Sequence, residues 1–334
     1  MRKTVIALII AAILAFGYLI SILLTPNIVG YAQVHIRPDG TIEPTSTPIT
    51  HDGNIYTLQK DITLDNLSIE KNNITLDGKG FSLRINGGLT KAGPTVGALK
   101  LSNIENVTFR NLNFTLTDLI FENSSFCKVQ NSFCNGIEIV NSRNIFATEN
   151  DMSTKDHFLS VKITNSAKCT ISSCTMYGAS LINSHENSIL NNIMIDTKRL
   201  GVKLENSSNN LFFGNSIEKT MQLFDFTGAS TNNLFVGNYI RGAFNFDTIL
   251  NCSGVNTFYH NNLIYVYWNQ NSTSSANMWD NGFEGNYWND YQGTDSNQDG
   301  IGDTPHQVDY NNIDRYPLMQ PLDLSKEPQP NLPK

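Results

Sequence analysis

A short segment near the carboxyl terminus carries oxygen donors at the spacing of a calcium-binding loop. The candidate ligands stand at alternate positions: Asp295, Asn297, Asp299, the backbone carbonyl of Ile301, and Asp303. Gly300 falls where such a loop turns sharply, and Ca²⁺ prefers hard oxygen ligands in this arrangement. His306 replaces the glutamate that closes an EF-hand, so Asp309 or Asp314 would have to complete the shell. The spacing predicts a structural Ca²⁺ site, and the alternative is a solvated turn rich in Asp, Asn and Gly.

Two pairs of charged residues recur 23 residues apart and are the candidates for catalysis. Asp196 precedes Lys219 by this interval, and Glu218 precedes Arg241. Carboxylates and a basic side chain on one sheet face would suit a polysaccharide lyase or a glycoside hydrolase. A hydrolytic pair needs carboxylates about 5 to 9 Å apart across a groove, and no second acid stands in a matching position. The pattern therefore favours ordinary surface ion pairs between neighbouring strands, which stabilise only weakly.

The 23-residue interval belongs to a repeat that positions these residues. Three columns of residues recur at this interval, one polar and two apolar. They are Asn192, Asn215, Asn238 and Asn261; Ile189, Phe212, Phe235 and Phe258; and Met194, Ile217, Ile240 and Leu263. Three columns in one register indicate a short unit stacked on copies of itself. We expect the apolar columns in the core. We expect the asparagines to form an amide ladder at a turn, in the left-handed backbone conformation.

Extending an asparagine column toward the amino terminus gives less regular steps. The positions assigned to it are Asn106, Ser125, Asn144, Lys168, Asn187, Asn210, Asn233 and Asn256. Steps of 19 to 24 residues leave room for three short strands and three turns, which make one coil of a parallel β-helix. The signature of a leucine-rich repeat is missing, and a propeller blade is nearly twice as long. The sequence therefore predicts an all-β solenoid.

The amino terminus predicts export. Arg2 and Lys3 precede an uncharged, mostly apolar run from Thr4 to Leu24, which is long enough to span a bilayer. Residues 1–33 are therefore either a signal peptide or a membrane anchor, and both place the rest of the chain outside the cytoplasm. We expect an extended lead-in over 34–53, the β-helix over 54–291, a calcium-loop cap over 292–320 and a Pro-rich tail over 321–334.

Aromatic residues gather in two places where they could contact a glycan. Trp279, Tyr287, Trp288 and Tyr291 precede the calcium loop, where packing over the last coil is the favoured interpretation and a sugar-stacking platform the alternative. Phe224, Phe226, Phe244, Phe246 and Trp268 lie farther back, and alternation along the strands would leave some of them outside.

Cysteine usage and charge exclude several other functions. The five cysteines, Cys127, Cys134, Cys169, Cys174 and Cys252, form no CxxC pair, and buried free thiols are favoured over disulfides, metal ligation or catalysis. The net charge is -7 with 16% charged residues, so the chain offers no basic stripe to a phosphate backbone. Nucleic acid is not expected as a partner.

Three segments resemble the NosD-like family of archaeal and bacterial surface proteins. They are HIRPDGTIEP from residue 35, KNNITLDGKGFSL from residue 71, and GNYWNDYQGTDSNQDGIGDTPHQVDYNNIDRYPLM from residue 285. The resemblance covers residues 34–320 and implies a right-handed parallel β-helix of the pectin-lyase-like superfamily. The family's copper is not expected here, because copper sites use His, Cys or clustered Met, whereas His51, His157, His185 and His260 are scattered singly.

The favoured function is a non-catalytic, exported cell-surface β-helix that binds a glycan or matrix and carries a structural Ca²⁺ site. The alternative is a polysaccharide lyase or glycoside hydrolase on the same fold, which a groove with three convergent charged groups would favour. A copper-delivery accessory protein is the third. The fold alone does not separate them.

Overall fold

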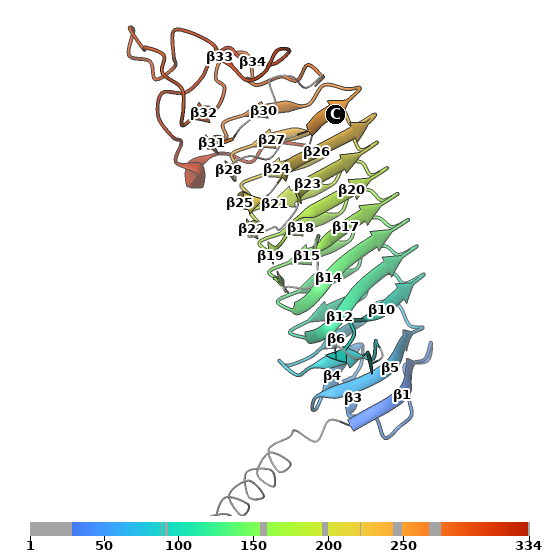
Figure 1. Cartoon of the computed structure of the whole chain (residues 1–334). Helices are drawn as coiled ribbons and strands as arrows, with labels where there is room; N and C mark the ends of the chain where they lie inside the picture. Colours follow the sequence, from blue (N-terminus) through green and yellow to red (C-terminus); the bar gives the residue numbers. More distant parts are fainter. Residues whose placement is uncertain are drawn as a thin grey trace, which may run out of the picture.

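A computed structural model describes residues 29–87, 89–90, 93–153, 159–195, 200–220, 222–242, 249–266 and 275–332. Within them the strands stack coil upon coil into a solenoid, as predicted (Figure 1). No helix of this described part is long and apolar enough to cross a membrane. Most of the predicted signal or anchor segment, residues 1–28, lies outside the described residues.

One face of the solenoid is an 11-stranded sheet of short strands, which we call the first sheet. Its strands, in order, are β3 (Ile49–Asp52), β4 (Ile55–Leu58), β6 (Thr75–Asp77), β11 (Thr108–Arg110), β13 (Lys128–Gln130), β15 (Phe146–Thr148), β18 (Thr170–Ser172), β21 (Ser188–Leu190), β24 (Leu211–Phe213), β27 (Leu234–Val236) and β30 (Thr257–Tyr259). From β4 onward each strand pairs in parallel with its copy one coil later.

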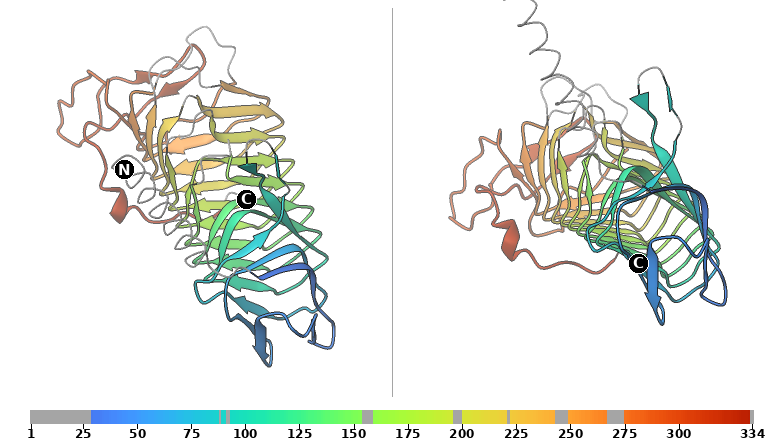
Figure 2. Two further views of the ribbon diagram at one scale, coloured as in Figure 1. Left: turned by 60° about the horizontal axis from the view of Figure 1, so that its bottom comes forward. Right: turned by 90° about the horizontal axis from the view of Figure 1, so that it is seen from below.

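A 15-stranded second sheet forms the other two sides of the coil (Figure 2). Its longer strands are β10 (Gly97–Ser102), β12 (Asn113–Glu122), β14 (Phe133–Val140), β17 (Val161–Thr164), β20 (Ala179–Ile182), β23 (Leu200–Glu205), β26 (Gln222–Gly228) and β29 (Ile249–Cys252). Its remaining strands are β16 (Asp151–Met152), β19 (Thr175–Met176), β22 (Ile193–Ile195), β25 (Ser216–Thr220), β28 (Tyr239–Gly242), β31 (Asn262–Ile264) and β32 (Tyr287–Trp288). The two groups meet at β14, which pairs with both β16 and β17.

The solenoid begins before residue 54. The first strands form a separate sheet of β1 (Val29–Ile36), β2 (Ile42–Glu43), β5 (Ile62–Ile69) and β7 (Leu83–Ile85). Strand β1 pairs in parallel with β5, with Val34 beside Leu67, so part of the predicted lead-in belongs to the first coil.

Smaller elements complete the described chain. They are the pairs β8 (Leu89–Thr90) with β9 (Gly93–Pro94) and β33 (His306–Gln307) with β34 (Ile313–Asp314), and the 3-10 helix η1 (Leu324–Lys326). The tail around η1 is fastened to the last coils, because His260 Nδ1 lies 2.7 Å from Glu327 Oε1 and Asn262 Nδ2 donates to the carbonyl of Leu322 at 3.0 Å.

The predicted aromatic column lies in the core. The rings of Phe212 and Phe235 stack with centroids 4.4 Å apart, and those of Phe235 and Phe258 with centroids 4.7 Å apart. Trp279 stacks on Phe258 at 4.4 Å and closes the column. Trp279 and Trp288 are both almost fully buried, which confirms that they pack over the last coil.

The predicted asparagine ladder is also confirmed. Asn192 donates its Nδ2 to Asn215 Oδ1 at 3.0 Å, and the same bond recurs from Asn215 to Asn238 at 3.0 Å and from Asn238 to Asn261 at 2.9 Å. Every member is buried, so the ladder satisfies polar groups that no water reaches. A second ladder runs beside it from Asn187 through Asn210, Asn233, Asn256 and Asn277 to Asn312.

The left-handed residue is not the one predicted. It is the residue directly before each ladder asparagine: Asn191 (φ 53°), Gly214 (φ 66°), Gly237 (φ 64°) and His260 (φ 55°). The left-handed residue turns the chain, and the asparagine that follows it points inward.

Candidate functional site

The predicted catalytic residues do not form a site in the described residues. Glu218 and Arg241 are register partners on β25 and β28, as predicted. Glu218 accepts a hydrogen bond from Ser216 Oγ at 3.0 Å, and the Arg241 guanidinium lies over the ring of Tyr265 at 5.9 Å. Asp196 lies outside the described residues, as does the side chain of Lys219. Of the predicted catalytic residues, the structure therefore describes one pair of surface charges, Glu218 and Arg241.

Most of the predicted glycan-contacting aromatics are core residues or lie outside the described residues. Phe224 and Phe226 are fully buried and pack against Phe235, with centroids 5.3 and 5.5 Å from its ring. Both therefore face inward, because residues two apart in a strand share a face. Phe244, Phe246 and Trp268 lie outside the described residues.

The acidic loop folds as a hydrogen-bonded turn. Asp295 Oδ2 accepts from the backbone of Gly300 at 2.9 Å, and Asn297 Nδ2 donates to Asp299 Oδ2 at 2.9 Å. Gly300 has φ 86°, the sharp turn that the spacing predicted. Asp303 instead contacts Ser296, whose hydroxyl donates to Asp303 Oδ2 at 2.7 Å. This hydrogen bond makes the largest contribution to lowering the pKa of Asp303. The structure thus brings three of the four predicted side-chain ligands together.

Asp309 and Asp314 are buried and do not join the acidic loop. They end the two ladders instead. Asn312 donates its Nδ2 to Asp309 Oδ1 at 2.8 Å, and Asn286 donates its backbone N–H to Asp314 Oδ2 at 2.8 Å. The expectation that either would complete a calcium shell is therefore wrong.

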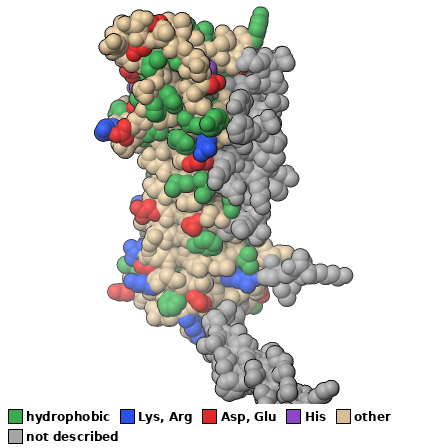
Figure 3. Space-filling model, turned by 60° about the vertical axis from the view of Figure 1, so that its left-hand side comes forward, with side chains coloured by type: hydrophobic (Ala, Val, Ile, Leu, Met, Phe, Trp, Pro, Cys, Tyr) green, Lys and Arg blue, Asp and Glu red, His purple; other side chains and the backbone are tan. Residues whose placement is uncertain are grey.

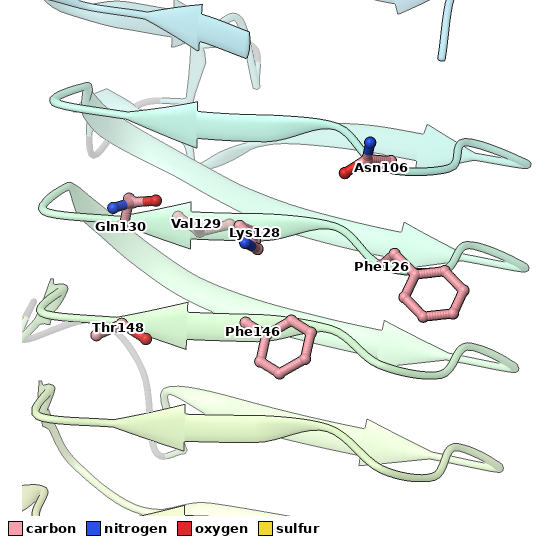
Figure 4. A pocket seen from close by; sticks show the side chains of 7 residues that line it. All are labelled: Asn106, Phe126, Lys128, Val129, Gln130, Phe146 and Thr148. Carbon is pink, nitrogen blue, oxygen red and sulfur yellow. The ribbon is translucent and has the colours of Figure 1, made fainter. Parts of the chain in front are cut away.

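An open hollow of about 480 Å³ lies on the outer face of the first sheet (Figure 4). Its lining comes from three neighbouring coils: Asn106, Phe126, Lys128, Val129, Gln130, Phe146 and Thr148. The register of β13 and β15 places Lys128 beside Phe146 and Gln130 beside Thr148. The rings of Phe126 and Phe146 project from adjacent coils, and Lys128 lies beside Phe146 (Figure 4). The hollow thus combines two aromatic rings, a cation, two amides and a hydroxyl.

Phe126 departs from the rule of its own column. Backbone hydrogen bonds align one left-handed residue from each coil: Asn73, Asn106, Phe126, Asn144, Lys168, Glu186, Asn209 and Asn232, with φ between 52 and 59°. This conformation is costly for a bulky aromatic residue and easy for asparagine. Phe126 adopts it with 44% of its surface exposed. A bulky residue in this conformation, with nearly half of its surface exposed, is unusual, and such departures from a local rule are concentrated at functional sites.

Side-chain hydrogen bonds join neighbouring asparagines in that column, and Phe126 interrupts them, as Lys168 and Glu186 do farther along. Asn106 donates its Nδ2 to Asn73 Oδ1 at 2.9 Å, and Asn232 donates to Asn209 Oδ1 at 2.6 Å. Phe126 has no polar group with which to continue the series from Asn106 to Asn144. The hollow opens at this interruption.

Lys128 brings an uncompensated positive charge to the hollow. It is exposed, and it forms no ion pair among the described residues, whereas Lys100 pairs with Glu122 at 2.9 Å. Glu105 and Glu149 are exposed beside lining residues, at the margins of the hollow. On the described part of the face in Figure 3, acidic and basic side chains are interspersed, without a large patch of one charge.

Sequence reasoning missed this site through a slip of one residue. The column that starts at Asn106 does not continue through Ser125, because Ser125 pairs with Glu105 and Arg143 in a neighbouring column. The residue equivalent to Asn106 is Phe126. The signal that would have found it is an aromatic residue in a turn column otherwise occupied by Asn, Lys and Glu.

A smaller hollow of about 160 Å³ lies on the outer side of the second sheet. Asp118, Glu138 and Lys162 line it, and Lys162 Nζ is 3.7 Å from Glu138 Oε1. Three charged side chains from β12, β14 and β17 therefore converge there. This is the arrangement that the enzymatic alternative requires.

A comparison with protein-family models matches residues 66–293, more than half of the chain, to the periplasmic copper-binding protein (NosD) family. The chain belongs to the NosD family. The match confirms the family that the sequence resembles and, of the three segments, includes the one from residue 71 in full. The strand stacking confirms the parallel β-helix that the resemblance implied. No curated protein sequence matches the chain.

Solved structures with a similar course of the chain are other β-helix proteins. A mutant of the periplasmic alginate epimerase AlgG is 11% identical, over 75% of this chain and 83% of that one, with a TM-score of 0.44. A tailspike protein mutant of E. coli bacteriophage HK620 is 12% identical, over 69% and 54%, with a TM-score of 0.42. The Streptococcus pneumoniae surface adhesin PfbA is 14% identical, over 67% and 70%, with a TM-score of 0.38. Likeness at this level carries no functional argument.

The described residues of this NosD family member do not fit a copper centre. Copper favours His, Cys and Met donors. All five cysteines are free and buried, and burial raises the pKa of Cys127 and of Cys169 to about 11, which disfavours the thiolate that a metal needs. Among the described residues, no three His, Cys, Asp or Glu side chains come together as a metal site.

Proposed function

We propose that this NosD family member is an exported protein that binds carbohydrate in the hollow around Phe126, Lys128 and Phe146. Phe126 carries the proposal, because an exposed ring is held in a backbone conformation that favours asparagine. Residues that break a local rule without helping the fold mark functional sites. The predicted signal or anchor segment, the periplasmic family and the open β-sheet face all suit a partner outside the cytoplasm.

The lining suits a sugar. The apolar C–H face of a pyranose can pack against the two phenyl rings, which present flat apolar surface to solvent. Its hydroxyls can meet the amides of Asn106 and Gln130 and the hydroxyl of Thr148. A carboxylate on the sugar would meet Lys128, which has no internal ion pair to break among the described residues. An acidic polysaccharide therefore fits better than a neutral one.

A double variant, Phe126→Asn with Phe146→Thr, restores the residue types found one coil away. Asn144 follows Phe126 in its column, and Thr170 follows Phe146. Because burying a phenylalanine side chain is worth about 1.5–3 kcal/mol, we expect each substitution to weaken binding of polygalacturonate or hyaluronan at least about tenfold. Titration calorimetry measures the affinity. The melting temperature should stay unchanged or rise, since Asn relieves the strain at residue 126.

Tyr310→Ser supplies the matched control, because Tyr310 is 85% exposed on the cap and away from the hollow. Its binding should equal that of the wild type. The proposal fails if the double variant binds normally, or if the wild type binds neither acidic polymer nor the neutral polymers dextran and laminarin. Release of short fragments from a polymer, abolished by Glu138→Gln, would support the enzymatic alternative instead.

We also propose that the acidic loop binds Ca²⁺ through Asp295, Asn297, Asp299 and the carbonyl of Ile301, with Asp303 joining them when the ion is present. The alternate spacing and the turn at Gly300 support this. Calcium at about 100 times its Kd would stabilise the fold by about 2.7 kcal/mol. The melting temperature is therefore expected to be several degrees higher in calcium than in EGTA. Asp299→Ala should remove the difference, while Asp52→Asn, in an exposed hairpin, should retain it. Equal melting temperatures of the wild type in both buffers would contradict the proposal.

A further inference from the structure

A second hollow adjoins the first one. It measures about 560 Å³ and is lined by Lys79, Asn111, Asn131 and Phe133, among others. Gln130 lines the first hollow and Asn131 the second, so consecutive residues of one chain segment line the two hollows. We propose, on the basis of the proposed function, that both hollows form one groove for a linear acidic glycan that crosses the solenoid along a coil.

The length of the groove suits several sugar units. One continuous stretch of backbone, from Phe126 through β13 to Phe133, contributes to both hollows. At about 3.3 Å per residue in a strand, this stretch spans on the order of 20 Å, reduced by the turn at Asn131, where φ is 47°. That span is several times the length of a single sugar ring. A monosaccharide would fill only one of the two hollows.

The second hollow repeats the chemistry of the first. Phe133 is half-buried and offers part of its ring, and Lys79 is exposed. The Lys79 ammonium lies 3.8 Å from Asp77, a carboxylate that already accepts hydrogen bonds from Arg110 at 2.9 Å and Asn111 at 3.1 Å. Asp77 is therefore well compensated without Lys79. An aromatic ring and an available cation thus recur, as a chain with repeating carboxylates would require.

The second hollow also holds an amide oxygen with no partner along its column. Asn131 donates its Nδ2 to Asn111 Oδ1 at 2.8 Å, which continues a short ladder that starts at the buried Asp77 and reaches the surface. The next position of that column is Glu149, as the backbone bonds show. An ionised carboxylate has no proton to donate, so the ladder stops and leaves Asn131 Oδ1 for a ligand hydroxyl. The margin of the groove at Glu149 is acidic, which disfavours a carboxylate there and favours one at Lys79 or Lys128.

The test compares galacturonate oligomers of two, four and six units by titration calorimetry. For the wild type, affinity should rise at least about tenfold from the dimer to the hexamer, because the longer chain adds a second buried ring contact. A Lys79→Asn, Phe133→Thr double variant should lose that rise and bind the dimer as the wild type does. Both substitutions suit the backbone, since Asn readily adopts the φ of 52° at residue 79 and Thr175 occupies the column of Phe133 two coils later.

The outcomes separate the two proposals. Phe126→Asn should weaken all three oligomers equally, whereas the second-hollow variant should affect only the longer ones. If the wild type binds dimer and hexamer with equal affinity, or if the second-hollow variant binds the hexamer normally, the extended groove is wrong and the single site stands. If no oligomer binds and no polymer binds, both proposals fail. Melting temperatures within about a degree of the wild type would exclude misfolding as the cause.

Discussion

Replacing Asn238 with alanine is expected to destabilise the protein by about 3 kcal/mol. Asn238 is fully buried at the middle of its ladder. Its Nδ2 donates to Asn261 Oδ1 and to the carbonyl of Phe212, each at 2.9 Å, and its Oδ1 accepts from the backbone and side chain of Asn215. Alanine leaves several of these groups buried without a partner, and each such group costs about 1–3 kcal/mol. Urea denaturation measures the change in the free energy of unfolding.

The matched control is Asn165→Gly, in an exposed ladder on the surface. Asn165 donates its Nδ2 to Asn141 Oδ1 at 3.1 Å, and its φ is 49°, which glycine adopts freely. Water can replace that bond, so we expect a change within about 0.5 kcal/mol. Equal effects of the two substitutions would show that burial does not set the importance of the ladder.

The second large effect is the dependence of stability on the ionisation of Asp314. Burial raises the pKa of this carboxyl to about 6 from its ordinary 3.8, although Trp288 Nε1 donates to it at 2.8 Å. Between those values the folded chain holds a proton that the unfolded chain has lost. Stability contributed by this group therefore falls as the pH rises from about 4 to about 6, by up to about 3 kcal/mol.

Denaturation of the wild type and of Asp314→Asn at several pH values isolates this effect. Asparagine does not titrate at this position. The wild type should therefore lose stability relative to Asp314→Asn as the pH rises from about 4 to about 6. Asp77 and Asp280 have lowered pKa values, so their contributions are lost at lower pH and are common to both proteins. A difference that stays constant over this range would contradict the assignment.

The upper coils could be predicted from the sequence because their repeat is strict. The fixed interval alone assigns Phe235 to the core and Asn238 to a buried ladder, and both lie there. The hollow around Phe126 could not be predicted, because coils near Phe126 vary in length and a register error of one residue moves a side chain to another face. That error put Ser125 where Phe126 stands. The left-handed positions were also missed by one residue, since two adjacent residues share each turn.

The cap shows a second limit of sequence reasoning. Asp309 and Asp314 sit close to an acidic loop in the sequence, and proximity suggested a shared metal. The structure uses both to accept hydrogen bonds inside the protein. Local spacing cannot reveal that a buried amide one coil away needs an acceptor, since that requirement arises only when the coils stack.

The ladders give the solenoid a direction of growth. In both buried ladders the amide of one coil donates toward the carboxyl-terminal neighbour, so the donor end of these aligned amides points toward the cap. A carboxylate receives that end, and an ionised carboxylate cannot pass a hydrogen bond on. A new coil inserted between Asn215 and Asn238 would find a donor in the Asn215 amide and an acceptor in the Asn238 carbonyl oxygen. A coil appended after Asp314 would find no side-chain donor there to continue the ladder. Duplication of internal coils is therefore the permitted route by which such a protein lengthens, and the end marked by Asp309 and Asp314 stays fixed.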